Sequence, residues 1–107
     1  MLFMTRVKLA KPEGMANKEF YEVWLQEAEA TVAAMKAGML KGVYKVPGRY
    51  EVIVLLEVDS ADTIDHLVHS MPLWKLGYSH LVTDLEWTAL RPYENWAEDL
   101  KALAAEG

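Results

Sequence analysis

Glu27 is the side chain in this sequence that is best placed for acid–base chemistry. A helix through this segment, turning about 100° per residue, presents an apolar arc made of Phe20, Tyr21, Trp24, Ala28, Val32 and Met35. Glu27 falls within this arc once its flank of smaller residues is included, whereas Glu29 lies outside it. A carboxylate among apolar groups is costly to ionise, so its pKa should rise and it could move protons. The alternative is an ion pair between Glu27 and a Lys or Arg at the helix edge.

His80 is the second candidate for moving a proton, because an imidazole titrates near neutral pH. We expect it to begin a strand directly after an aromatic connection, and such junctions often hold functional residues. His66 and His69 lie opposite the apolar stripe of the helix expected at 61–71, which is typical of solvated side chains. No pair of histidines joins a carboxylate at the spacing of metal ligands, so we expect no metal.

Three further side chains have types suited to binding a small molecule. Trp74 and Tyr78 stand in an irregular connection expected at 73–79, where their rings could wall a pocket for a flat or cyclic ligand. Arg49 follows a Pro-Gly turn and could bind a carboxylate. The simpler interpretations are core packing for the two aromatic residues and an exposed turn for Arg49.

The strand expected at 50–58 is the element that says most about assembly. Its first face carries Val52, Val54, Leu56 and Val58, and its second face carries Ile53 and Leu55 between Glu51 and Glu57. A strand wetted on one side alternates apolar and polar residues throughout. A domain of 107 residues has enough helix to cover one face of a sheet. We therefore expect the second face to meet another copy of the chain, in an oligomer whose sheets pair face to face.

The remaining elements complete a single domain over residues 1–107. We expect strands at 2–9, 39–46, 50–58 and 80–90, and helices at 17–37, 61–71 and 93–105. Asn17 and Ser60 are the expected N-caps, while Gly38 and Pro72 are expected to end the first two helices. The order βαββαβ with an extra C-terminal helix predicts an α+β, ferredoxin-like fold. The helix at 93–105 is expected to pack on a neighbouring subunit.

This topology places the first strand between the third and the fourth, which brings charged residues side by side. Arg6 and Lys8 would lie between the acids Glu51, Glu57, Asp84 and Glu86. One interpretation is a ladder of cross-strand ion pairs, each worth about 0.2–1 kcal/mol. The other is that some of these groups face a pocket in the oligomer and have shifted pKa values.

Composition excludes several classes of function. The net charge is −5, and no basic cluster is present, so nucleic-acid binding is not expected. The chain has no cysteine, which excludes disulfides and thiolate chemistry. No apolar stretch approaches the roughly 20 residues that cross a bilayer, and the N-terminal segment lacks the pattern of a signal peptide. We therefore expect a cytoplasmic protein.

The sequence resembles the muconolactone Δ-isomerase family over most of residues 1–75. The matching elements, in order, are Met1-Leu2-Phe3, the acid pair Glu27 and Glu29, Gly38, Gly48-Arg49-Tyr50, Val58 with Ser60, and Pro72-Leu73-Trp74. The resemblance implies ferredoxin-like subunits that pair through their sheets and often form larger rings. It also implies isomerisation of small unsaturated lactones in aromatic-compound breakdown, without metal or cofactor. By position it makes Glu27 the acid or base and places Arg49 and Tyr50 near the lactone.

The chain departs from the family pattern at three positions that commonly hold histidine, where it has Met4, Gly42 and Arg49. The segment 75–83 is longer than the family's, and the helix around Trp96 is extra. These departures favour a substrate other than that of the namesake enzyme.

The sequence as a whole predicts a muconolactone isomerase-like enzyme that catalyses cofactor-free proton transfer on a small unsaturated lactone or related cyclic carbonyl compound. Glu27 and His80 are the expected proton carriers. The expected substrate contacts are Arg49, Tyr50, Trp74 and Tyr78. One alternative is a cofactor-free monooxygenase or cyclase of the dimeric α+β barrel type, and the other is a non-catalytic protein that binds small ligands.

Overall fold

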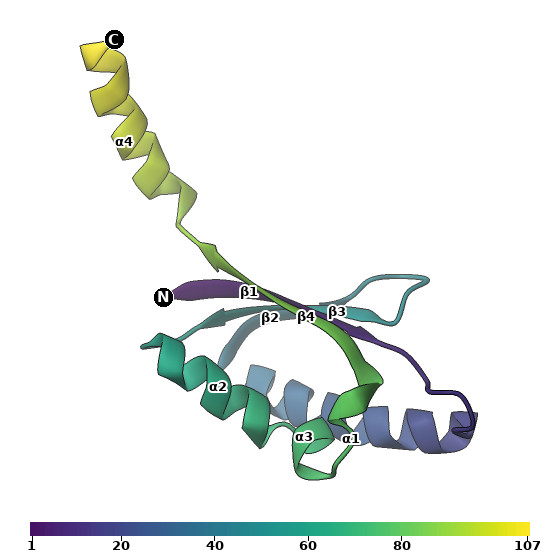
Figure 1. The fold of residues 1–107 in the computed structure, drawn as a ribbon. Coiled ribbons are helices and arrows are strands. Elements are labelled where there is room, and N and C mark those ends of the chain that lie inside the picture. The colour runs from purple at the N-terminus through teal and green to yellow at the C-terminus, as the bar shows by residue number, and fades with distance from the viewer.

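The computed structural model describes all residues 1–107 and shows one four-stranded sheet with helices on one of its faces (Figure 1). The strands are β1 (Leu2–Leu9), β2 (Leu40–Lys45), β3 (Glu51–Glu57) and β4 (Val82–Leu90). The helices are α1 (Asn17–Lys36), α2 (Ala61–Ser70), α3 (Pro72–Lys75) and α4 (Tyr93–Glu106), with a 3-10 turn η1 (Ser79–Leu81) before β4. The strand order β2-β3-β1-β4 is antiparallel throughout. The predicted order β1-α1-β2-β3-α2-β4 with a C-terminal helix is confirmed, as is the central place of β1.

The C-terminus of α1 ends as its sequence predicts. Gly38 has φ +82°, in the left-handed region that suits glycine. Its N–H donates to the carbonyl of Met35 at 3.0 Å, and the N–H of Met39 donates to that of Ala34 at 3.0 Å. These two bonds form a Schellman motif, which satisfies carbonyl groups left over at the end of the helix.

The predicted cap of α1 and the predicted start of β4 were wrong, and a short helix after α2 was not predicted. Asn17 is the first helical residue rather than the cap, and Ala16, which offers no capping side chain, stands before it. Ser60 does hold the N-cap position of α2, but it makes no side-chain capping bond. Pro72 ends α2 and at once starts α3, because its fixed φ suits the first position of a helix. His80 lies in η1 rather than at the start of β4.

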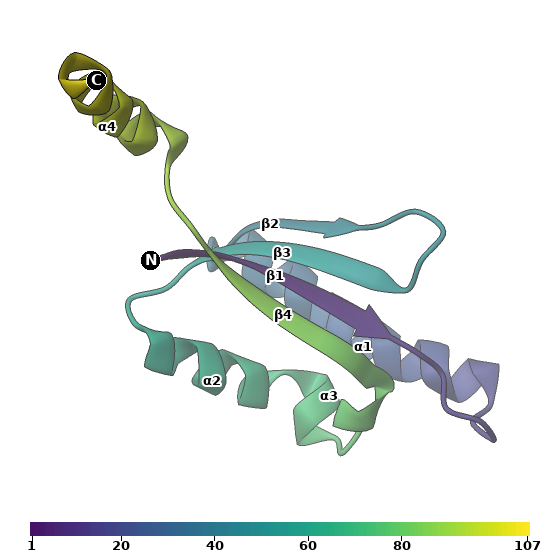
Figure 2. The ribbon, with the colours of Figure 1, turned by 45° about the horizontal axis from the view of Figure 1, so that its top comes forward.

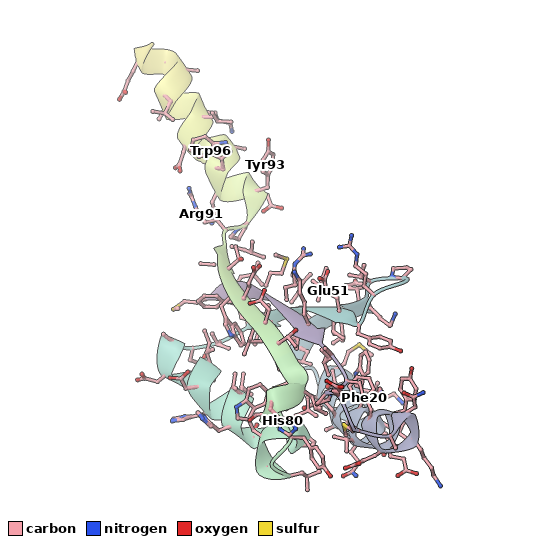
Figure 3. All side chains as sticks on the ribbon, turned by 45° about the vertical axis from the view of Figure 1, so that its right-hand side comes forward. Phe20, Glu51, His80, Arg91, Tyr93 and Trp96 are labelled. Carbon is pink, nitrogen blue, oxygen red and sulfur yellow. The ribbon has the colours of Figure 1, made fainter.

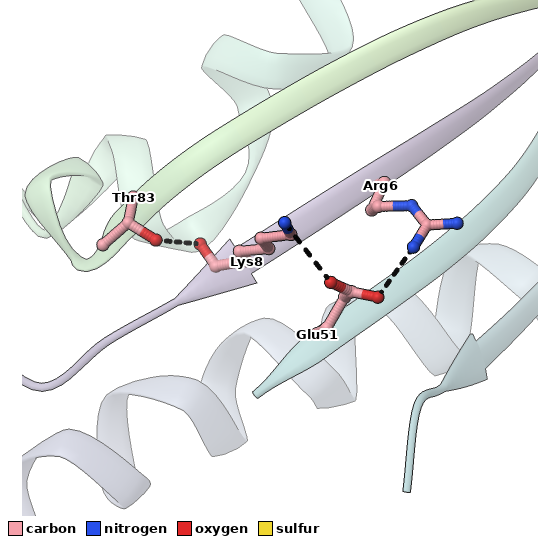
Figure 4. Close-up of polar contacts among 4 residues, drawn as sticks. All are labelled: Arg6, Lys8, Glu51 and Thr83. Carbon is pink, nitrogen blue, oxygen red and sulfur yellow. Dashed lines mark hydrogen bonds and ion pairs between the residues drawn. The ribbon is translucent and has the colours of Figure 1, made fainter. Parts of the chain in front are cut away.

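On the outer face of the sheet, the predicted ladder of ion pairs forms only at Glu51 (Figure 4), and Glu57 pairs instead with the N-terminal amino group at 3.1 Å. Arg6 Nη1 lies 2.9 Å from Glu51 Oε2, and Lys8 Nζ lies 3.8 Å from Glu51 Oε1. Glu51 is only 2 % exposed, so both cations compensate a buried carboxylate. On the other side of β1, Asp84 and Glu86 are in register with Lys8 and Arg6 but form no ion pair with them.

The core lies on the inner face of the sheet, beneath α1 and α3. Its buried cluster consists of Val7, Leu9, Phe20, Val23, Leu73 and Leu81. The outer face has no helix over it (Figure 1). Its side chains include Leu2, Met4, Ile53 and Leu55, all half-buried in the single chain. The pairing of this face with a second copy stays a prediction.

Helix α4 extends away from the rest of the chain in both views (Figures 1 and 2). The molecule is consequently elongated, with principal extents of 61 × 27 × 22 Å. Tyr93, Trp96, Leu100 and Leu103 are exposed at helical spacing, and Figure 3 shows Tyr93 and Trp96 far from the sheet. An unpartnered apolar stripe of this kind is unusual on an isolated helix. No helix in the structure has the length and apolar character needed to cross a membrane.

Candidate functional site

A cavity of about 510 Å³ lies between α1 and the inner face of β1, β2 and β3. Fourteen of its seventeen lining residues are hydrophobic, and Glu27 is the only carboxylate among them. Tyr21, Trp24 and Tyr50 give it an aromatic wall. The volume falls within the range of about 300–1,000 Å³ that is typical of small-molecule sites.

The periodicity of α1 carries Glu27 into this cavity. The buried residues of α1 are Phe20, Val23 and Glu27, which follow one another at helical spacing. Phe20 and Val23 pack into the core, and Glu27 continues the same face one turn later. The predicted position of Glu27 on the apolar arc is thus what the structure shows.

Glu27 is a buried carboxyl group without a cationic partner. It is 7 % exposed, and no Lys, Arg or His lies within ion-pair distance of it. Burial raises the pKa of Glu27, and a hydrogen bond from the backbone N–H of Leu73 to Oε1, at 3.2 Å, opposes this effect only in part. Leu73 is the second residue of α3, where backbone N–H groups have no partner within the helix. Glu27 therefore has the environment of a proton carrier.

A second cavity, of about 170 Å³, adjoins Glu27 on the side of α2 and β4. The two cavities share five lining residues: Val7, Glu27, Thr31, Val54 and Met71. The remaining walls of the second cavity are mostly aliphatic, with Trp87 as the one aromatic residue. Glu27 thus stands at the boundary between an aromatic and an aliphatic space.

Tyr50 is the second predicted site residue that lines the larger cavity. Its hydroxyl is hydrogen-bonded to that of Tyr21, and this bond is the main reason why the pKa of Tyr50 is raised. Its ring stands nearly perpendicular to that of Trp24, with centroids 5.3 Å apart and planes at 86°. These edge-to-face contacts fix the aromatic wall. The structure thus brings together Glu27 and Tyr50, which are 23 residues apart in the chain.

The other predicted site residues lie elsewhere. Arg49 is exposed in the turn before β3 and lines neither cavity. Trp74 and Tyr78 pack against the core cluster instead of walling a cavity. His80 is exposed (Figure 3). Its ring stacks on that of Tyr78, with ring centroids 6.2 Å apart.

Tyr78 is tied to α1 rather than to the cavity. Its hydroxyl donates to Glu19 Oε1 at 3.2 Å, and this bond to a carboxylate is the main reason why the pKa of Tyr78 is raised. The contact joins the connection before β4 to the start of α1. The structure therefore gives Tyr78 a role in tertiary packing.

Among the cavity residues that were not predicted as site residues, Tyr21 and Lys45 carry polar groups that could contact a ligand. Tyr21 was assigned only to the apolar arc of its helix, although its hydroxyl reaches Tyr50. Lys45 is the only cation that lines the larger cavity. The signal for Lys45 was present, because alternation along β2 puts it on the same face as Val43.

The sequence of this chain matches one known protein family. The sequence profile described as muconolactone delta-isomerase matches residues 1–95. The chain belongs to the muconolactone delta-isomerase family. The predicted resemblance is thereby confirmed, and α4 lies almost entirely beyond the matched residues. None of the curated proteins matches the chain.

Solved structures show the same fold at low sequence identity. A muconolactone isomerase is 18% identical, with a TM-score of 0.69, over 86% of this chain and 90% of that one. A 5-chloro-2-hydroxyhydroquinone dehydrochlorinase from Burkholderia phenoliruptrix AC1100, in complex with 2,5-dihydroxybenzoquinone, is 16% identical with a TM-score of 0.59. That match covers 85% of this chain and 94% of the dehydrochlorinase.

One departure from the family pattern lies beside the exposed ring of Tyr44. Gly42 stands in β2, where the resemblance led us to expect a histidine, and it is buried. A Cβ at this position would lie 2.9 Å from the ring of Tyr44. The Tyr44 ring therefore occupies the space that a side chain at position 42 would need.

Proposed function

We propose that this member of the muconolactone delta-isomerase family is an enzyme that isomerises a small unsaturated lactone or related cyclic carbonyl compound by cofactor-free proton transfer. The observation that carries the proposal is Glu27, the one carboxylate in an apolar cavity, with a pKa raised by burial and no compensating cation. A carboxyl group with a raised pKa can both accept and return a proton, because its protonated and ionised forms are both accessible closer to neutral pH.

The proposed reaction gains and loses no atoms. Ionised Glu27 takes a proton from the saturated ring carbon next to a C=C bond that is conjugated with the carbonyl group. The C–H electron pair enters the conjugated system and forms a dienolate. Protonated Glu27 then returns the proton to another carbon of that system, and the double bond ends one position away. The N–H of Leu73 holds Oε1, while Oε2 accepts no hydrogen bond from the protein and is available to the substrate.

The aromatic wall and Lys45 supply the complementary groups. We infer that the flat ring lies against Trp24 and Tyr50, and that the hydroxyl pair of Tyr21 and Tyr50 is close enough to the ring to donate to the dienolate oxygen. Lys45, at the edge of the cavity, offers a positive charge to the same oxygen or to a carboxylate. The scheme gives no part to Trp74, Tyr78 or His80, which line neither cavity.

Replacement of Glu27 by Gln tests the proposal. With muconolactone as the probe substrate, Glu27→Gln should lower turnover by about 10²-fold or more, the scale of one acid–base group. For the unaltered enzyme, kcat/KM should rise as pH increases through the raised pKa of Glu27, because the ionised form starts the reaction.

Glu29→Gln is the matched control, because Glu29 is exposed on the same helix and lines neither cavity. Its turnover should equal that of the unaltered enzyme. Equal turnover in Glu27→Gln, with the fold verified by circular dichroism, would remove Glu27 from the mechanism.

A second candidate function is oxidation or cyclisation of a larger ring without a cofactor. The size and aromatic wall of the larger cavity favour it. A solved structure of the same fold, the dehydrochlorinase, is described in complex with a flat quinone. Consumption of dissolved oxygen on addition of a hydroquinone, measured with an oxygen electrode, would distinguish oxidation from isomerisation.

We infer that the working form is a cytoplasmic oligomer in which the outer faces of two sheets meet. Ile53 and Leu55 are apolar on a face without any helix over it, and removing such surface from water stabilises association by about 25 cal/mol per Å². The exposed stripe of α4, which includes Trp96 and Leu100, is the second surface that a neighbouring subunit would cover.

A further inference from the structure

We propose that the substrate is a ring that carries an apolar tail, with the ring in the larger cavity and the tail in the smaller one. The inference rests on the proposed function, because it takes Glu27 as the group that reacts with the ring. It goes further in naming the class of substrate: a tailed cyclic carbonyl compound rather than a compact lactone.

The lining of the smaller cavity is the first support. Its walls include Ala34, Leu56, Leu67, Val68 and Leu85, which together offer an aliphatic surface. Hydroxyl groups of Thr5 and Ser70 also border it, but each already donates to a backbone carbonyl, at 2.9 and 2.7 Å. An alkyl group is the chemical group that such a lining recognises, because burial of each methylene contributes about 0.8 kcal/mol.

The position of Glu27 is the second support. Helix α1 borders both cavities, with Trp24 in the wall of the larger one and Ala34 in the wall of the smaller one. With a rise of 1.5 Å per residue, Glu27 lies roughly 5 Å along the helix axis from Trp24 and roughly 10 Å from Ala34. A ring that packs against Trp24 therefore lies near Glu27, and a tail on that ring can extend past Glu27 toward Ala34.

The boundary between the cavities is apolar apart from Glu27 and one threonine hydroxyl. Besides Glu27 it consists of Val7, Thr31, Val54 and Met71. Thr31 directs its hydroxyl to the carbonyl of Glu27 at 2.8 Å, which leaves its methyl group for apolar contact. Met71 is half-buried and unbranched, and a methionine side chain adapts its rotamer to irregular ligands.

A series of ligands that differ only in tail length tests the inference. Butenolides with methyl, propyl, pentyl or heptyl substituents on the ring would be titrated calorimetrically against the unaltered chain and against Glu27→Gln. We expect the dissociation constant to fall about fourfold for each added methylene until the smaller cavity is full. A dissociation constant that does not change with tail length would overturn the inference.

Two alanine positions in α1 provide a matched pair of variants. Ala34→Leu adds bulk to the smaller cavity and should abolish the gain from long tails while leaving the methyl compound unaffected. Ala33→Leu makes the same change at an exposed neighbour that lines neither cavity, and it should leave the whole series unchanged. If the dissociation constant falls equally with tail length in the unaltered chain, Ala34→Leu and Ala33→Leu, the tail binds outside the smaller cavity and the inference is refuted.

The two proposals fail in distinguishable ways. Glu27→Gln should lose turnover and still show the gain with tail length. If Glu27→Gln keeps full turnover and still binds longer tails more tightly, the proposed mechanism is refuted. The assignment of the ring to the larger cavity and of the tail to the smaller cavity is then supported. If Glu27→Gln loses turnover and the dissociation constant does not change with tail length, the role of Glu27 as proton carrier is supported. The proposed tail site in the smaller cavity is then refuted.

Discussion

The buried, unpaired carboxyl group of Glu27 should make the stability of the fold depend on pH in a definite direction. Its pKa in the folded chain is raised from an ordinary value of 4.5 by burial, against a weaker opposing effect of the Leu73 N–H. The side chain of Gln has nearly the same shape, and its amide oxygen can still accept the bond from Leu73. Glu27→Gln therefore removes the titration while it changes little else.

The sign follows from proton counts. Below pH 4.5 the carboxyl is protonated in both the folded and unfolded chains, and its contribution to stability is present in full. As pH rises, the unfolded chain loses the proton first, so the free energy of unfolding decreases until pH has passed the raised pKa of the folded chain. One group transfers at most one proton, which limits the slope to about 1.4 kcal/mol per pH unit.

Urea denaturation of both proteins at a series of pH values, at one fixed protein concentration, provides the measurement. The free energy of unfolding of the unaltered chain minus that of Glu27→Gln should decrease from pH 4 upward and level off above the raised pKa. Glu29→Gln serves as the control on the exposed face of the same helix, and its profile should run parallel to that of the unaltered chain.

A difference between the unaltered chain and Glu27→Gln that stays constant from pH 4 to pH 8 would refute the reasoning. It would mean that the carboxyl is as well solvated in the folded chain as in the unfolded one. A difference that increases with pH would be worse for the proposal, because it would require a partner that stabilises the ionised form. Either result would remove the physical basis for a proton carrier in the cavity.

Two other predictions concern the outer face of the sheet. Arg6→Met leaves the buried carboxylate of Glu51 with Lys8 alone, at 3.8 Å, and should lower the free energy of unfolding by about 3 kcal/mol. The double variant Arg6→Met with Glu51→Gln should recover most of that loss in urea denaturation, and a double variant less stable than Arg6→Met would contradict the assignment. Sedimentation at micromolar concentration should show dimers or larger species, and Leu55→Lys should dissociate them because it places a charge on the bare face. Well-folded monomers of the unaltered chain would rule out sheet pairing.

The local patterns in the sequence predicted the elements well and their ends less well. Gly38 ended α1 because a left-handed residue is needed there, which is a local requirement that the sequence expresses directly. Pro72 was predicted only to stop a helix. It also starts α3, a helix that the sequence pattern at 73–79 did not predict.

The sequence by itself determined the fold class and the place of Glu27 on a buried face, because helical periodicity records which residues face the core. The tertiary structure decided which side chains meet Glu27. Tyr50 reaches the same cavity through the return of β3 beneath α1, whereas Trp74 and Tyr78 pack against the core. The N–H that binds Glu27 belongs to Leu73, 46 residues further along the chain. Contacts of this kind depend on how distant elements pack, and no periodicity within either segment encodes them.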